Sequence, residues 1–248
     1  MNNIFLLLKY DFITLKGKYF KLLLFAFLLP LSLILFFSIP LSYVFLNLKP
    51  IYLIWSTAGI SVISTIIFSF INNINSLFNK LKKEFIFSVP VSFSNIILSV
   101  YLFSMILSML EFSISIILIN SLNNNFLSIL DCLFIFLLLI PSIFIFTAAS
   151  IITACFMKER ISFIVLILFL FVVASFGLGA FLPLSIYPDL YYNIIKYFPL
   201  SSSMLNIQKI ISADYIYFSY LIVSCIYSIF FVLLSIVVLN NKIKERLF

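Results

Sequence analysis

The residue best suited to chemistry in this sequence is one carboxylate, Glu111, which lies inside the apolar run 93–119. A charged side chain at the centre of a bilayer costs roughly 2.5–3.5 kcal/mol on insertion scales, so such a residue usually faces a bundle interior or a water-filled path. One interpretation places Glu111 on a substrate or proton path. The other makes it a structural glutamate, protonated or hydrogen-bonded by one of the many Ser and Tyr side chains.

A second polar feature is the stretch NKLKKEFIFSVPVS, residues 79–92, in a chain that is 65% hydrophobic and only 9% charged. It carries Lys80, Lys82, Lys83 and Glu84, and the apolar Phe85, Ile86 and Phe87 follow. Because these charges need water or lipid headgroups, we expect the stretch to connect two segments that cross the membrane.

Other chemistry finds little support in the sequence. There is no histidine, which excludes histidine-ligated haem or zinc and histidine general bases. The glycines form no P-loop, so we expect this chain to bind no nucleotide in that way. Cys132, Cys155 and Cys225 are isolated in or beside apolar runs, which is typical of small buried hydrophobic residues. We predict no metal site, no catalytic residue and no cofactor held by this chain.

The elements that must position Glu111 are long apolar runs. A chain of 248 residues with 32 phenylalanines cannot hide that much apolar surface from water, so lipid must be the solvent for most of it. Runs of about 20 residues suffice to cross the hydrocarbon core as helices. We therefore predict an all-α integral membrane protein, a single domain over 1–248, with six spans. These are residues 22–46, 51–71, 93–119, 132–156, 161–187 and 215–239.

Residues 1–21 predict an amphipathic helix ahead of the first span. Phe5, Leu8, Phe12, Leu15 and Tyr19 recur at steps of three and four, with lysines between them. We expect this helix to lie in the inner interface, with its apolar face toward acyl chains. The alternative is a plain extension of the first span.

The basic residues predict the orientation. Twelve of the fifteen fall on one side of the six predicted spans: Lys9, Lys16, Lys18, Lys21, Lys80, Lys82, Lys83, Lys158, Arg160, Lys242, Lys244 and Arg246. Only Lys49, Lys196 and Lys209 fall on the other. Since the basic side is cytoplasmic, both termini are predicted inside the cell, and the net charge of +7 reflects topology and anionic lipid rather than nucleic-acid binding.

Two polar connections are longer than the rest. The cytoplasmic one covers residues 72–90, and the outer one covers 188–214. The outer segment is rich in tyrosines, which indicates short helices dipping into the interface. Its serines Ser201–Ser203 predict a cap for a helix over 204–211.

Two local patterns resemble the permease subunits of ABC-2-type exporters. Members carry R-x-x-G-T-L-E-x-L-x-x-x-P-V-S before their third span, and Glu84, Ile86 and the Pro-Val-Ser of 90–92 keep that spacing here. Phe78 stands in place of the arginine, and 81–83 are Leu-Lys-Lys in place of Gly-Thr-Leu.

The second pattern is a glycine, F-P-x-x-x-x-P, and then P-L-[ST] before the sixth span. The chain reads GAFLPLSIYPDL and later YFPLSSSM, which supplies Gly179, Pro183, Pro188 and Pro199. Leu178 replaces the usual serine and Leu182 the usual phenylalanine. With the six runs, the resemblance covers essentially the whole chain.

The resemblance implies a multi-pass inner-membrane permease that works as a homodimer or with a sister permease. A separate ATPase subunit would carry ATP and Mg²⁺, so this chain would not itself be an enzyme. The connection 72–90 would dock on that ATPase, with charge for a polar interface and apolar anchors beside it. These coupling residues would be Lys80, Lys82, Lys83, Glu84, Phe85 and Ile86. Gly179, Pro183, Pro188 and Pro199 would form the outer gate.

Two other classes of protein compete with this interpretation. A secondary transporter driven by an ion gradient should show inverted repeats or broken helices near the membrane midplane. A membrane-embedded lipid-modifying enzyme without histidine should show a polar cluster at one membrane level. A docking role for residues 80–86 also has an alternative, which is a basic anchor with no partner.

Overall fold

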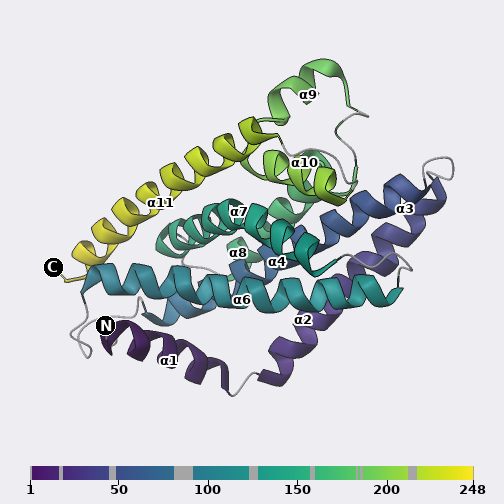
Figure 1. Ribbon diagram of the computed structural model, residues 1–248. Helices are drawn as coiled ribbons and strands as arrows, with labels where there is room; N and C mark the ends of the chain where they lie inside the picture. The colour runs from purple at the N-terminus through teal and green to yellow at the C-terminus, as the bar shows by residue number, and fades with distance from the viewer. Residues whose placement is uncertain are drawn as a thin grey trace.

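The computed structural model of the chain describes residues 2–16, 19–44, 49–80, 92–122, 128–156, 160–182, 184, 187–211 and 217–247. All regular secondary structure in these ranges is helical (Figure 1). The prediction of an all-α fold is therefore confirmed for this part of the chain. Lipid offers no partners for backbone N–H and C=O groups, and helices satisfy those groups internally.

The helices differ widely in length, from single turns to elements long enough to pass a bilayer. In chain order they are α1 (Asn2–Lys16), α2 (Tyr19–Leu33), the π-helix η1 (Ile34–Ser38), α3 (Ile39–Val44), α4 (Lys49–Lys80), α6 (Phe93–Leu122), α7 (Ile129–Phe156), α8 (Arg160–Val172), the π-helix η3 (Val173–Gly177), α9 (Asp189–Ile195), α10 (Pro199–Ile211) and α11 (Phe218–Leu247).

Five helical segments within the described residues are long and apolar enough to cross a membrane: Phe20–Leu41, Gly59–Leu77, Phe93–Ser121, Ile129–Phe156 and Phe218–Lys242. Each overlaps one of five predicted spans, and Gly59–Leu77 lies several residues further along the chain than the predicted span 51–71. In the remaining prediction, 161–187, the continuous helix ends at Gly177, where η3 ends. Gly179, whose φ is +83°, takes the chain out of the helix soon afterwards. A sixth span and the orientation stay predictions.

Helix α4 is longer than the predicted span 51–71. The predicted connection 72–90 begins as helix, because residues 72–80 continue α4. Its buried face continues as well: Ile74 and Leu77 are almost fully buried, which keeps the helix packed on its neighbours for two further turns. Residues 81–91 lie outside the described part of the chain.

The predicted interfacial helix 1–21 corresponds to α1, which lies beside α6 (Figure 1). Leu8 and Phe12, from the face predicted to meet acyl chains, pack on the protein instead. The rings of Phe12 and Phe103 meet edge to face with centroids 5.6 Å apart. Phe5 alone of the described members of that face is strongly exposed, at 70%. The apolar face of α1 is therefore shared between the bundle and its surroundings.

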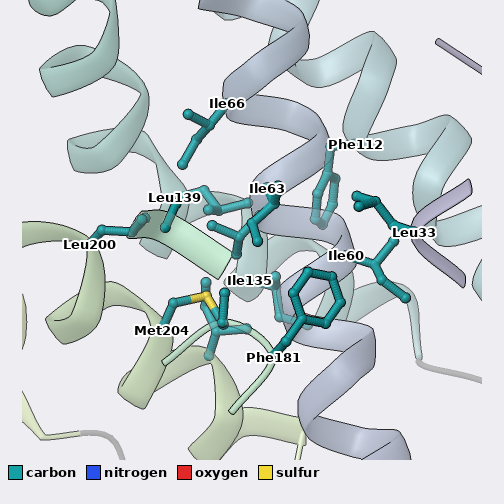
Figure 2. Packing of buried hydrophobic residues seen from close by; sticks show 14 of the residues in the cluster. Leu33, Ile60, Ile63, Ile66, Phe112, Ile135, Leu139, Phe181, Leu200 and Met204 are labelled. Carbon is teal, nitrogen blue, oxygen red and sulfur yellow. The ribbon is translucent and has the colours of Figure 1, made fainter. Parts of the chain in front are cut away.

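Two clusters of buried side chains mark opposite ends of the bundle. The termini end joins Leu77, Tyr101, Cys155 and Leu239, and both chain termini lie there (Figure 1). The opposite end joins four elements through Ile60, Ile135, Phe181 and Met204 (Figure 2). Helix α7 finishes at the termini end, whereas Ala174 of η3 belongs to the opposite cluster. Helix α8 with η3 therefore runs between the two ends.

The π-helices η1 and η3 meet through one ring. The centroid of Phe37, in η1, lies 5.9 Å from that of Phe171 and 5.9 Å from that of Phe176, in η3. It stacks on Phe181 at 5.4 Å. Both breaks in regular α-helix therefore fall at the opposite end, and π-helical turns of this kind frequently accompany functional sites.

Helix α10 begins earlier than predicted. Its first residue is Pro199, whose missing N–H and fixed φ suit the first helical position. The hydroxyls of Ser202 and Ser203 both donate to the Pro199 carbonyl, at 2.9 and 3.3 Å. The predicted capping serines thus lie inside the helix, and the prediction of a helix starting at about residue 204 is wrong.

Candidate functional site

Glu111 belongs to a polar stripe along α6. Ser104, Ser108, Glu111 and Ser115 are spaced by four, three and four residues, so they share one face of the helix. All four are fully buried. The stripe therefore faces the inside of the bundle, and none of it faces the lipid side.

Hydroxyl pairs connect this stripe to the helices on either side. The Ser115 hydroxyl lies 2.7 Å from that of Ser64 in α4, and the Ser104 hydroxyl lies 2.6 Å from that of Thr147 in α7. Ser64 and Thr147 each already donate to a carbonyl of their own helix, so the α6 serines are the donors in both pairs. We call Ser64, Ser104, Ser108, Glu111, Ser115 and Thr147 the polar seam.

Glu111 itself forms no hydrogen bond with the other members of the seam. Both of its carboxyl oxygens are buried without a hydrogen-bond partner in the described structure, and so is the hydroxyl of Ser108 one turn away. An unpaired carboxylate in a low-dielectric interior is costly. A proton, a cation or a rearranged hydroxyl must therefore balance this group, and the structural interpretation with a Ser or Tyr partner is not what this structure shows.

The second unusual region is non-helical chain at the opposite end. We call residues 178–182 and 184, between η3 and α9, the broken segment. Gly179 has a φ of +83°, and a Cβ built there would lie 2.7 Å from the Leu184 Cγ. Ala180 and Phe181 are fully buried. Irregular backbone at this depth is tolerated only where protein or a water-lined cavity covers it.

Side chains from α9, α10 and the turn before α9 satisfy the backbone of this region. The Gln208 amide donates to the Gly179 carbonyl at 3.1 Å. The phenol of Tyr191 donates to the Gly177 carbonyl at 2.8 Å, and that of Tyr187 donates to the Phe176 carbonyl at 2.5 Å. Each of these carbonyls would lack a helical partner where the helix stops. Side chains therefore supply the hydrogen bonds that these three carbonyls lose where the helix ends.

Close backbone contact fixes the broken segment against α4. A Cβ added to Gly59 would lie 2.1 Å from the carbonyl oxygen of Ala180, so only glycine fits there. Our sequence reasoning missed this contact. The available signal was a lone glycine inside an otherwise apolar helix, which often marks a close approach of another backbone.

The predicted gate residues do not all come together. Gly179 lies in the broken segment, bonded to α10, and Pro199 starts that helix and is buried. Leu178 and Pro199 line one cavity. Pro188 precedes α9 and is exposed, away from the buried part of the region. Pro183 lies outside the described residues.

The predicted coupling residues are almost entirely outside the described part of the chain. Lys80 is the last residue of α4, and its backbone alone is described. Lys82, Lys83, Glu84, Phe85 and Ile86 fall in 81–91. Their docking role stays a prediction.

One buried contact near that connection was missed. Asp11 of α1 is 1% exposed, and its Oδ1 accepts a hydrogen bond of 2.6 Å from the Ser76 hydroxyl of α4. The signal lay in the spacing: Asp11 is four residues after Leu7, which is also buried, so the two share a face. The contact fixes α1 to α4 one turn before Lys80.

The fold and these two regions define an all-α membrane protein with five candidate membrane-crossing helices among its described residues. Comparison with protein-family models, curated proteins and solved structures found no match to the chain. Any more specific function is therefore argued below from the chain's own residues.

Proposed function

We propose that this chain is the membrane-spanning permease subunit of an ATP-driven ABC exporter, coupled to a separate ATPase. Residues 80–86, between α4 and α6, would dock on the ATPase, and a second permease copy or a sister permease would complete the path. The ATPase would carry ATP and Mg²⁺. This proposal extends the resemblance of the 78–92 and 179–201 patterns to the ABC-2 permeases.

The observation that carries the proposal is how the bundle divides between its two ends. The C-terminal end of α4, the N-terminal end of α6 and both termini lie together, and the broken segment lies at the opposite end (Figure 1). A transporter driven from the cytosol needs a docking element on one side and a part that opens on the other. Helix α8 with η3, taken as the sixth crossing, gives an even number of passages and agrees with both termini on one side.

Purification from native membranes tests this proposal. The tagged chain should retain, at near-equal amounts, an ATPase that carries a G-x-x-x-x-G-K-[ST] motif. The double variant Lys82→Glu/Lys83→Glu should lower the retained ATPase by about tenfold, which corresponds to a loss of about 1.4 kcal/mol of binding free energy. The control Lys242→Glu/Lys244→Glu changes the net charge equally at the end of α11 and should retain it. Purification without such a partner, or equal loss in both variants, contradicts the proposal.

An ion-coupled secondary transporter is the second candidate, and two observations favour it. Glu111 is fully buried without a partner, and the bundle contains non-helical chain at 178–182, as transporters of that class do. Proteoliposomes that contain this chain alone distinguish the two. A secondary transporter dissipates an imposed proton or sodium gradient without nucleotide, and Glu111→Gln abolishes that flux. An exporter subunit shows no such flux without its ATPase.

A further inference from the structure

A cavity lies where α7, α10, α11 and the broken segment meet. Its volume is about 150 Å³. The lining comprises Ser142, Ile145, Phe146, Leu178, Phe198, Pro199, Leu200, Tyr227 and Phe231. Ser142 already donates to the Ser203 hydroxyl at 2.9 Å, so its hydroxyl is engaged. An engineered apolar cavity of about 150 Å³ binds small apolar molecules, so this volume suffices for a small apolar group.

The cavity is closed at its base and open at its edge. Leu178 and Leu200 are 6% and 2% exposed, whereas Phe198 and Tyr227 are 49% and 39% exposed. Its open edge faces the surroundings of the bundle beside α11. The apolar part of this helix, Phe218–Lys242, is only 17% buried. For a membrane protein those surroundings are lipid acyl chains, so an acyl chain is the apolar group that would reach this cavity.

A cluster of tyrosines and lysines borders this edge directly. Lys196 lies 5.3 and 5.2 Å from the ring centroids of Tyr192 and Tyr197, and its Nζ donates to Asn193 at 2.8 Å. Tyr197 precedes the cavity residue Phe198. The basic and apolar surfaces are therefore continuous along the chain.

The same cluster extends across to α11. The ring of Tyr220 lies 5.9 Å from that of Tyr197 and 5.4 Å from that of Tyr217. Lys209 lies 5.7 Å from the Tyr217 ring. On α11, Tyr220, Tyr227 and Phe231 are spaced by seven and four residues, so one helical face passes from the cluster into the cavity.

We propose that this place binds one anionic membrane phospholipid. The end of an acyl tail enters the cavity, and the phosphate is held near Lys196 at the tyrosine cluster. Basic residues at the membrane surface bind anionic headgroups, and tyrosines prefer the headgroup level. The side of the chain that is poor in basic residues carries three lysines, and Lys196 and Lys209 both lie in this cluster. The proposal does not depend on the ATPase partner.

Photo-crosslinking tests where the tail lies. The purified chain is placed in phosphatidylcholine vesicles that contain a minor share of phosphatidylglycerol with a photoreactive group at the end of one tail. Crosslinks should concentrate on peptides carrying Phe198–Leu200 and Tyr227. Ile145→Trp, which fills the cavity, should reduce them to the level of the exposed faces, while Leu137→Trp on the lipid side of α7 should leave them unchanged. Crosslinks spread evenly over exposed helix faces overturn the proposal.

The headgroup is tested separately by native mass spectrometry, with variants that do not touch the core. The wild-type chain should retain phosphatidylglycerol in preference to phosphatidylcholine. Lys196→Gln should lower this preference about fivefold, the contribution of one lysine near anionic lipid. Lys242→Gln removes the same charge at the termini end and should not change it. An equal effect of both variants, or no preference in the wild type, overturns the proposal.

Discussion

The polar seam and the broken segment both place polar groups inside an apolar bundle, but they differ in whether those groups have hydrogen-bond partners. At the broken segment and at the end of η3 just before it, Gln208, Tyr187 and Tyr191 each donate a hydrogen bond to a backbone carbonyl. In the polar seam the backbone is regular, yet the carboxyl of Glu111 is left without a partner. The first arrangement stabilises the conformation seen in this structure, so an opening at that end has to break these bonds. The second leaves the buried Glu111 carboxyl to be balanced by a proton, a cation or a rearranged hydroxyl, which is typical of a functional position.

Gly59→Ala should have the largest effect, because it breaks the contact that positions the broken segment. The new Cβ would lie 2.1 Å from the Ala180 carbonyl oxygen and 2.8 Å from its carbon, and neither atom can move without the backbone. We expect a loss of about 3 kcal/mol or more, at the upper end of overpacking effects. Thermal unfolding of the purified protein, followed by size-exclusion chromatography, measures it.

Gly177→Ala is the matched control for this substitution. A Cβ at Gly177 would lie 3.5 Å from the Tyr191 phenol and 3.8 Å from Val173, which are ordinary contacts. The unfolding temperature should stay close to that of the wild type. If Gly59→Ala is equally harmless, the broken segment is not fixed against α4 as described.

Gln208→Met should have the next largest effect. The substitution keeps the side-chain volume and removes the donor to the Gly179 carbonyl, which lies in a fully buried stretch. Leaving a buried acceptor unsatisfied costs about 1–3 kcal/mol. Denaturation in a mixed-detergent series measures the change, and Gln208→Glu at low pH, where a neutral acid again offers a donor, should recover part of it. Full stability of Gln208→Met would contradict the assigned role of this bond.

Hydroxyl pairs in the polar seam should matter less. Interhelical hydrogen bonds in membrane proteins contribute about 0.6 kcal/mol on average. A double-mutant cycle with Ser104→Ala and Thr147→Val should return a coupling of that size, since the two hydroxyls lie 2.6 Å apart. A coupling several times larger would indicate that the seam mainly stabilises the fold and does not serve as the polar surface of a path.

Glu111→Gln should have the smallest effect on stability and a large one on transport. Because the carboxyl has no partner to lose, the unfolding temperature should stay unchanged or rise. If Glu111 lies on the path, substrate-stimulated activity of the assembled transporter should fall sharply. Marked destabilisation would instead assign Glu111 a structural role, and full activity with full stability would remove it from the path.

The helical class and the place of the membrane-crossing runs could be predicted because apolar length is a local property of the sequence. Glu111 was found for the same reason, since a carboxylate inside an apolar run is visible without any partner. The end of the helix at Gly177, well before residue 187, depends on a φ of +83° at Gly179 and on α10 covering the break. Runs of apolar residues do not encode such turns.

Contacts between distant residues were beyond the sequence. Three contacts join segments that are far apart in the chain. Ala180 approaches Gly59, Asp11 accepts a hydrogen bond from Ser76, and the Phe37 ring of η1 lies near the Phe176 ring of η3. The early start of α10 was missed because Ser201–Ser203 look like caps, whereas Pro199 starts the helix and the hydroxyls of Ser202 and Ser203 donate to its carbonyl.

The proposed coupling to an ATPase is tested most directly at Phe85. A photoreactive phenylalanine analogue at this position keeps an aromatic side chain and reports its neighbours in native membranes. We expect a crosslinked product between this chain and a cytosolic P-loop ATPase, and Lys82→Glu/Lys83→Glu should lower its yield about tenfold. Crosslinks to lipid alone, or labelling of residue 85 by a reagent confined to the outer side, would contradict the proposed function.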